Sequence, residues 1–256
     1  MKLTLFYDAQ SLFDRSLIKL VRNPTLLATN LVQPLLFLVL FSQLFQRLTL
    51  FSVTSGNYLS FLMPGIVVMN ACIGALQSGT SIVNDLNSGF LQKLLMTSVA
   101  RPAILLGRLL TDVFMVLVQS IITIVVAVVM GVVIVTGISG ILLILATAAF
   151  FELALSGFFL ALGMRTRRLD TVSAVGSVLF FPLIFVSSAI FPSSFFPPWA
   201  QIVSEFNPVS YASDVTRYLV QGGLPPSALA SAYAMIALIT VATFAAALYQ
   251  FRKVIA

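Results

Sequence analysis

Six long apolar stretches constrain this chain more than any other feature of its sequence. The hydrocarbon core of a bilayer is about 30 Å thick, so a helix that crosses it needs about 20 mostly apolar residues. The sequence therefore predicts an all-α membrane protein with six transmembrane helices, over residues 26–45, 58–83, 113–135, 138–163, 172–191 and 228–249. Only Thr136 and Gly137 separate the third span from the fourth, which predicts a tight helical hairpin.

Composition excludes a water-soluble fold. Hydrophobic residues make up 59% of the chain and charged residues only 9%, whereas a soluble domain has about 25% charged residues. The polar surface is too small to cover the molecule, so lipid must cover much of it. The net charge of +6 could indicate nucleic-acid binding in a soluble protein. Here the basic residues lie between the apolar runs, so they are better explained by membrane topology.

The basic residues are divided unevenly between the two sides of the predicted membrane. Cytoplasmic segments of membrane proteins carry an excess of Lys and Arg. Only Arg47 and Arg217 fall on the outer side, which predicts cytoplasmic amino and carboxyl termini. The other twelve of the 14 basic residues are Lys2, Arg15, Lys19, Arg22, Lys93, Arg101, Arg108, Arg165, Arg167, Arg168, Arg252 and Lys253.

Residues 3–22 have the pattern of an amphipathic helix that lies along the membrane surface. Leucine and phenylalanine recur at helical spacing on one side of it. Such a helix could be an interfacial anchor, or it could dock a cytoplasmic partner. Its polar side includes Asp14, Arg15, Lys19 and Arg22.

The longest predicted cytoplasmic connection is residues 84–108. Asn84 and Asp85 could cap a short helix there, and Gly89 permits a tight turn. The apolar stripe of that helix would consist of Phe90, Leu91, Leu94 and Leu95. A short helix held at the cytoplasmic surface has the shape of a lever that another protein could push; the alternative is an ordinary solvated loop.

On the outer side, residues 192–227 are too rich in Pro and polar groups to cross the membrane. Two apolar stripes, separated by Asn207 and Pro208, predict a helix-turn-helix that dips into the outer leaflet and caps the bundle. Asp214 and Arg217 could pair on the second helix. The segment could anchor in the membrane interface or gate an exit path. Its stripes include Trp199, Ile202, Val203 and Phe206, then Tyr211, Val215, Tyr218 and Leu219.

Polar groups within the spans are candidates for a cavity. A charge at the bilayer centre costs about 2.5–3.5 kcal/mol, so Glu152 must face protein, water or a partner. It could line a cavity, or it could be a hydrogen-bonded carboxyl that packs two helices together. The carboxamides of Gln33, Asn70, Gln77 and Gln119 could line the same interior or simply pack helices. Ala71, Ala75 and Gly79 form a small-residue ladder, a candidate helix contact or dimer seam.

Several absences narrow the chemistry. The chain has no histidine, which removes Ser-His hydrolysis and the usual zinc sites,. It has no G-x-x-x-x-G-K-[ST] run that could hold ATP phosphates,. We therefore predict no catalytic site and no metal. A proton-coupled secondary transporter using Glu152, and a structural assembly factor, stay open as alternatives.

Residues 58–112 resemble the type-2 (ABC-2) permeases of ABC exporters, in the branch of the daunorubicin-resistance and nodulation-factor exporters. Within this run the likeness rests on Pro64-Gly65, Gly89-Phe90-Leu91, Lys93-Leu94, Arg101-Pro102 and Gly107. The outer segment matches as well. There the shared residues are Phe191-Pro192, Pro198-Trp199, Asn207-Pro208, Tyr211 and Arg217.

The resemblance implies one transmembrane domain over residues 1–256. Residues 1–25 would form the connecting helix, 26–191 the first five spans, 192–227 a re-entrant segment and 228–256 the sixth span. A coupling helix would sit in a cleft of an ATPase subunit, and its residues would be Asp85, Gly89, Phe90, Leu91, Lys93, Leu94 and Arg101. The outer gate would consist of Trp199, Phe206, Asn207, Tyr211, Asp214 and Arg217.

The same resemblance implies a transporter in a prokaryotic plasma membrane. It would contain two permeases, identical or sister, and two separate ATPase subunits. This chain would hold no cofactor, and the ATPases would bind ATP and magnesium. The substrate would be an amphipathic or hydrophobic drug, lipid or lipid-linked glycan.

Overall fold

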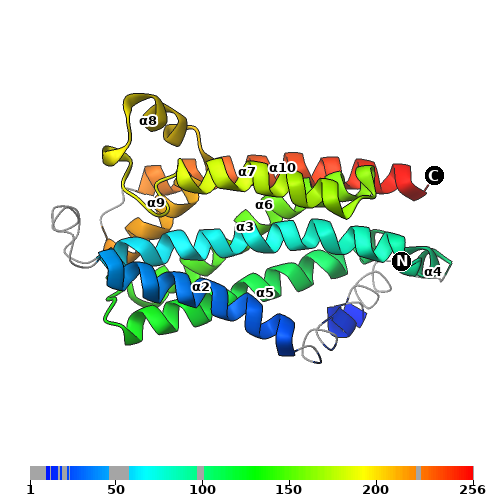
Figure 1. Ribbon diagram of the computed structural model, residues 1–256, viewed down its shortest axis with the longest axis horizontal. Coiled ribbons are helices and arrows are strands. Elements are labelled where there is room, and N and C mark those ends of the chain that lie inside the picture. Colours follow the sequence, from blue (N-terminus) through cyan, green and yellow to red (C-terminus); the bar gives the residue numbers. More distant parts are fainter. Residues whose placement is uncertain are drawn as a thin grey trace.

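The computed structural model describes residues 10–11, 13–16, 18, 22, 24–45, 58–96, 101–222 and 226–255. Within these ranges it does not describe the side chains of residues 24–29, 95, 101–102, 226–229, 231–232 and 252–255. The regular elements found in these ranges are all helices (Figure 1). They are α2 (Pro24–Phe45), α3 (Tyr58–Asn87), α4 (Phe90–Leu95), α5 (Arg101–Val129), α6 (Gly137–Thr166), α7 (Leu169–Phe185), the 3₁₀ turn η2 (Ser193–Phe195), α8 (Pro198–Glu205), α9 (Pro208–Gln221) and α10 (Pro226–Ile255).

Among the described residues, four helices are long and apolar enough to cross a membrane: α3, α5, α6 and α10. Helices α2 and α7 are also apolar, but their described apolar parts are shorter, at residues 30–45 and 169–185. The bundle leaves large apolar side chains on its surface, as a lipid-covered protein does. Examples are Val125 on α5, Leu142 on α6 and Leu238 on α10. The prediction of an all-helical fold is confirmed for the described residues, and the apolar helices fit a membrane protein.

Helix α3 is the centre of the bundle. Of an 18-residue apolar stretch of α3, 72% is buried within the molecule, against 17% for such a stretch of α10. It packs on α6 through small residues. A Cβ added at Gly79 would lie 2.7 Å from Phe159 Cβ, and one added at Gly163 would lie 2.7 Å from the Gly79 carbonyl oxygen. Gly79, the last member of the small-residue ladder, therefore makes a close helix contact within the chain.

The third span begins and ends earlier than predicted. The range 113–135 is wrong at both ends, because α5 runs from Arg101 to Val129 and residues 130–136 form the turn before α6. Hydropathy misses the first turns of α5 because they carry Arg108 and Asp112, whose charges pair with side chains on α3. The turn includes Gly131 at φ 105°, a conformation that favours glycine,.

The expected cap at Asn84 and Asp85 is wrong, because both residues lie inside α3, which continues to Asn87. The expected tight turn at Gly89 is confirmed. This residue has φ 69° and directly precedes α4, and a left-handed backbone costs glycine least. The described part of the connection 84–108 is thus mostly helical.

The fifth span also ends early, since α7 stops at Phe185. Residues 186–192 form a non-helical connection to the outer segment. Their apolar members suggested a longer helix, but Ala189 and Ile190 are buried inside the protein. Gly65 on α3 packs directly beneath Ala189: an added Cβ would lie 2.0 Å from the Ala189 carbonyl oxygen.

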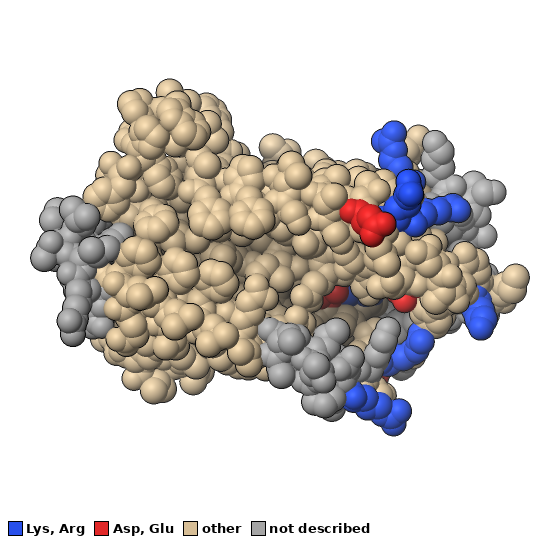
Figure 2. All heavy atoms as spheres, viewed as in Figure 1, with Lys and Arg blue, Asp and Glu red and all other residues tan. Residues whose placement is uncertain are grey.

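The bundle has two different ends (Figure 1). Helix α4 and the end of α10 lie at one of them, while α8 and α9 lie at the other, with α8 projecting from the bundle. Figure 2 shows the Lys and Arg side chains of this face gathered at the α4 end. The exposed ones include Arg15, Lys93, Arg165, Arg167 and Arg168. The charge asymmetry of the sequence is therefore an asymmetry along the long axis of the described structure.

Candidate functional site

The predicted coupling element is α4, a six-residue helix at the basic end of the molecule. Its Leu91 is 1% exposed and packs into the main core, whereas Phe90 and Leu94 are half-buried. Lys93 is exposed and Met96, just after the helix, is 88% exposed. One face of α4 is thus anchored on α3, and the other is open at the surface. The side chain of Arg101 lies outside the described residues.

The described part of the amino-terminal segment contacts this element. The guanidinium carbon of Arg15 lies 3.9 Å from the centre of the Phe90 ring, a cation–π arrangement. Phe13 meets Phe114 of α5 edge-to-face, with ring centres 5.7 Å apart. Asp14 is exposed and Arg22 lies in a turn, while Lys19 is outside the described residues. The structure brings Arg15 of the predicted connecting helix onto the predicted coupling helix.

Polar side chains connect α3 to α5 near α4. Arg108 Nη1 donates to Asp85 Oδ2 over 2.6 Å. One turn further along α5, Asp112 accepts a hydrogen bond from Ser78 Oγ. Asp85 was a candidate from the sequence, but Asp112 was missed. Asp112 follows Arg108 by four residues and so lies on the same side of the helix, and this spacing could have identified it.

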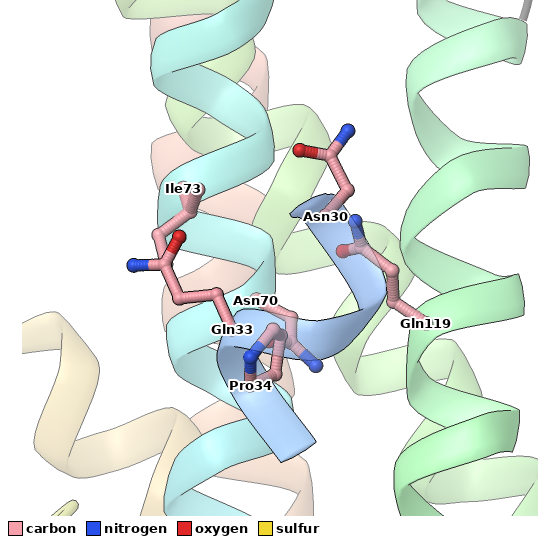
Figure 3. A pocket seen from close by; sticks show the side chains of 6 residues that line it. All are labelled: Asn30, Gln33, Pro34, Asn70, Ile73 and Gln119. Atoms are coloured by element: carbon pink, nitrogen blue, oxygen red, sulfur yellow. The ribbon is translucent and has the colours of Figure 1, made fainter. Parts of the chain in front are cut away.

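The intramembrane carboxamides largely come together between α2, α3 and α5. Figure 3 shows α2 side chains facing those of α3 and α5 around one small pocket. Gln77 pairs reciprocally with Asn30, over 3.0 and 3.3 Å, and ties α2 to α3 near this site. The sequence analysis missed Asn30. The residues that line the pocket are Asn30, Gln33, Pro34, Asn70, Ile73 and Gln119.

Glu152 does not join this group. It is fully buried on α6, where it accepts a hydrogen bond of 2.8 Å from Ser156 Oγ. Gly74 of α3 packs against it, since an added Cβ there would lie 2.8 Å from Glu152 Oε2. In this structure Glu152 packs α3 against α6 and is not among the residues that line the carboxamide pocket.

At the outer end, Arg217 of α9 connects three parts of the chain. Its Nη1 donates to Asp214 Oδ1 and its Nη2 to the Ser188 carbonyl oxygen, each over 2.6 Å. Its Nε donates to the Phe61 carbonyl oxygen over 3.4 Å, and the guanidinium carbon lies 3.7 Å from the centre of the Phe61 ring. The predicted Asp214–Arg217 pair is confirmed. Arg217 thereby ties α9 to α3 and to the connection after α7.

The charges at this outer cluster are balanced within the chain. Asp214 Oδ1 also accepts a hydrogen bond of 2.7 Å from Ser188 Oγ. Burial lowers the pKa of Arg217 to about 10, and the neighbouring Asp214 carboxylate opposes this fall,. Arg217 lies outside the spanning helices, and its guanidinium is therefore charged at neutral pH.

Asn207 begins α9 and fastens it to α7. Its Oδ1 accepts from Val209 N over 2.9 Å, as an N-cap does, and its Nδ2 donates to the Leu183 carbonyl oxygen over 2.8 Å,. Tyr211 is half-buried in the first turn. Gly222, at φ 77°, follows the last residue of α9. The two-helix prediction is confirmed, with α9 held firmly against the bundle.

Helix α8 differs from α9 because its apolar stripe faces outward. Trp199 is 64% exposed and Phe206 is 75% exposed; Ile202 and Val203 are exposed as well. The predicted gate residues therefore separate into two groups. Asp214 and Arg217 form a bonded pair and Asn207 fastens the start of α9 to α7, whereas Trp199 and Phe206 are exposed at the surface.

In the described part of the chain, no group of three or more His, Cys, Asp or Glu residues lies close enough together to hold a metal ion. What the arrangement offers is a surface helix at the basic end, a small polar pocket among the spans and a bonded outer cluster.

Comparisons with known proteins agree on one family. The model of the ABC-2 type transporter family matches residues 7–221. The chain is 34% identical over 224 residues to the transport permease ycf38 of Cyanophora paradoxa, covering 84% of this chain and 76% of that protein. It is 27% identical over 208 residues to the daunorubicin resistance ABC transporter permease protein DrrB1 of Streptomyces coeruleorubidus, covering 81% and 73%.

These matches confirm the resemblance seen in the sequence. The matched range includes Pro64-Gly65, the α4 region and the outer Asn207-Pro208. An all-helical bundle with four clear apolar spans fits a membrane subunit. The chain belongs to the ABC-2 type transporter family, and it is a membrane-spanning permease of an ABC transporter.

Proposed function

We propose that this permease is part of an ATP-driven exporter for amphipathic or hydrophobic molecules, taken from the cytoplasm or the inner leaflet. The observation that carries the proposal is the family match over residues 7–221. The relative from Streptomyces coeruleorubidus is named for daunorubicin resistance, which supports a drug-like substrate. Lipids and lipid-linked glycans belong to the same amphipathic class.

ATP hydrolysis belongs to a partner in this proposal. Residues 1–256 contain no P-loop sequence, and in this proposal an ABC ATPase partner would bind ATP and magnesium. Two permeases would pair, as identical copies or with a sister chain, and lipid would cover the outward apolar surface. The exposed apolar side chains of α5, α6 and α10 support that lipid contact.

The proposed topology has six spans in a prokaryotic plasma membrane, with both termini in the cytoplasm. At 1.5 Å per residue, the 22 residues of α2 extend about 33 Å and the 17 of α7 about 26 Å,. Both lengths are close to the bilayer core thickness. The basic side chains at the α4 end (Figure 2) support a cytoplasmic location for that end,.

Contacts around α4 suggest how movement would pass from the ATPase to the spans. Leu91 anchors α4 in the core, and Gly89 joins it to α3. Arg15 stacks on Phe90, and the Arg108–Asp85 pair links α3 to α5 close by. Displacement of α4 would therefore move α3, α5 and the amino-terminal segment together.

The outer cluster would act as the gate of the same cycle. Arg217 and Asn207 hold α9 against α3 and α7. An outward-open form would require these bonds to rearrange, so the structure described here would be the form closed on the outer side.

Affinity purification of the tagged chain in mild detergent tests the proposal. We expect a P-loop ATPase to co-purify in stoichiometric amount. The variant Phe90→Ser removes the ring under Arg15 and should reduce the recovered ATPase. Ser194→Asp, an exposed position at the outer end, is the control and should leave recovery unchanged.

The opposite result would overturn the proposal. If the wild-type chain purifies alone across several mild detergents, the ATP-driven cycle fails. Transport that stops with an uncoupler but not with ATP depletion would instead favour proton coupling, and Glu152→Gln would be the variant to examine.

A further inference from the structure

The carboxamide pocket between α2, α3 and α5 lies deep within the spans. Asn70 is 12 residues from the outer end of α3 and 17 from its inner end, or about 18 and 26 Å along the helix. Gln119 is likewise well inside α5. Polar side chains at this depth cost free energy unless they form hydrogen bonds within the protein or bind a ligand.

Asn70, which lines this pocket, has a buried polar atom without a partner among the described residues. Its side chain is 1% exposed, and its Nδ2 donates to Thr123 Oγ1 over 3.3 Å. Among the described residues, its Oδ1 has no hydrogen-bond partner. If the amide were rotated by half a turn, the nitrogen would be the free atom instead. A hydroxyl group, which both donates and accepts, would satisfy Asn70 in either orientation.

The size and charge of the pocket limit what can enter. The pocket has a volume of about 10 Å³, which is enough for roughly one water molecule. Its polar lining consists of carboxamides from Asn30, Gln33, Asn70 and Gln119, with no charged side chain. The pocket thus suits one small, uncharged group that forms hydrogen bonds, and it offers nothing to balance an ion.

The residues of α2 beside the pocket are exposed and mostly apolar. Gln33 is exposed on α2 and Asn30 is half-buried. Next to Gln33 on the same helix, Val32 and Leu36 are 49% and 51% exposed. A molecule with its hydroxyl in the pocket could therefore lay an alkyl or aromatic part along α2, where lipid would otherwise lie.

We propose that this pocket binds a single uncharged hydroxyl group of an amphipathic transport substrate that enters from the side of α2. The inference rests on the proposed export of amphipathic molecules, and it adds the polar group that the substrate must carry. Asn70 and Gln119 are the binding residues, and Asn30 is held in place by its pairing with Gln77.

Photolabelling of the full chain in phosphatidylcholine nanodiscs tests this site without an ATPase. Three probes share one eight-carbon chain with a diazirine near the head: an alcohol, an ammonium and a plain alkane. The alcohol should label peptides of α2, α3 and α5 at the pocket about fivefold more than the other two, the factor expected for one hydrogen bond. Excess unlabelled octanol should compete.

Two variants locate the effect. Asn70→Leu and Gln119→Met should each bring alcohol labelling down to the level of the alkane. Thr243→Val on α10, which does not line the pocket, is the matched control and should keep full labelling. If Asn70→Leu fails to fold, Gln119→Met and the comparison of probes on the wild-type chain still decide the question.

Equal labelling by the three probes, or full labelling of Gln119→Met, would overturn the hydroxyl site. Recovery of an ATPase partner is a separate measurement. A chain that co-purifies with its ATPase but shows equal labelling would contradict the pocket alone, whereas a chain that labels selectively but purifies alone would contradict the ATP-driven cycle.

Discussion

The two ends of this permease are held in different ways. At the outer end, Arg217, Asp214 and Asn207 bind main-chain and side-chain partners in their own chain. At the basic end, α4 is fixed mainly through Leu91, and Lys93 and Met96 are exposed. The charged groups of α9 thus bond within the chain, whereas α4 keeps exposed side chains next to its buried anchor.

This difference predicts that substitutions at the two ends will have different consequences. Changes at the outer end should lower the stability of the isolated permease, because they break bonds within the chain. Changes on the open face of α4 should leave stability intact and alter only the association with a partner.

The largest effect is expected at Gly65. In Gly65→Ala the new methyl would overlap the Ala189 carbonyl oxygen at 2.0 Å, and backbone on both sides would have to move. We expect a loss of about 3 kcal/mol or more, the upper range for overpacking. Thermal unfolding in detergent measures this, with Ser60→Ala on the same helix as the control. An unchanged unfolding midpoint would show that the outer contact is loose.

Arg217→Ala should rank second. It leaves the Ser188 carbonyl and the Asp214 carboxylate without the guanidinium. Because Asp214 is 45% exposed, water can recover part of the loss, so we expect about 2–3 kcal/mol. The same unfolding assay applies, and Arg165→Ala, an exposed arginine at the basic end, is the control. Equal midpoints for these two variants would contradict the outer cluster as a stabilising element.

Gly89→Ala tests the turn at the basic end. The added Cβ would meet nothing closer than 4.0 Å, so the cost comes only from the left-handed backbone at φ 69°, about 1–2 kcal/mol. Ser88→Ala, the preceding residue, should change the midpoint less. A loss as large as that of Gly65→Ala would mean that α4 is packed more tightly than its open surroundings indicate.

Lys93→Ala should have the smallest effect on stability, within about 0.5 kcal/mol, because its side chain is exposed,. We expect the amount of co-purified ATPase to fall nevertheless. An unchanged unfolding midpoint together with less co-purified ATPase would identify α4 as a docking face. An unchanged amount of ATPase would show that Lys93 is not part of that face.

Several site features could be predicted from local sequence alone. The Asp214–Arg217 pair follows from a three-residue spacing on a helix, and the turn at Gly89 from the properties of glycine. Other features required knowledge of which helices are neighbours. Asn30 pairs with Gln77, and Arg217 binds the Ser188 carbonyl, across 47 and 29 residues of sequence. No spacing rule reaches that far.

Hydropathy located every apolar helix but misplaced several helix ends. It ended the fifth span too late because Ala189 and Ile190 are apolar, although they are buried by protein. It began the third span too late because Arg108 and Asp112 are charged, although each finds a partner on α3. Hydropathy measures the preference of a residue for an apolar environment and cannot tell lipid from protein.

By itself, then, the sequence determined that this is an apolar helical protein with a basic end, since composition and spacing decide how a chain divides between water and lipid. Only the tertiary structure decided which polar side chains share a pocket and which pack helices, as Asn70 and Glu152 do respectively. That choice depends on helix rotation and neighbourhood, and these are set by the close contacts of small residues such as Gly79 and Gly163,.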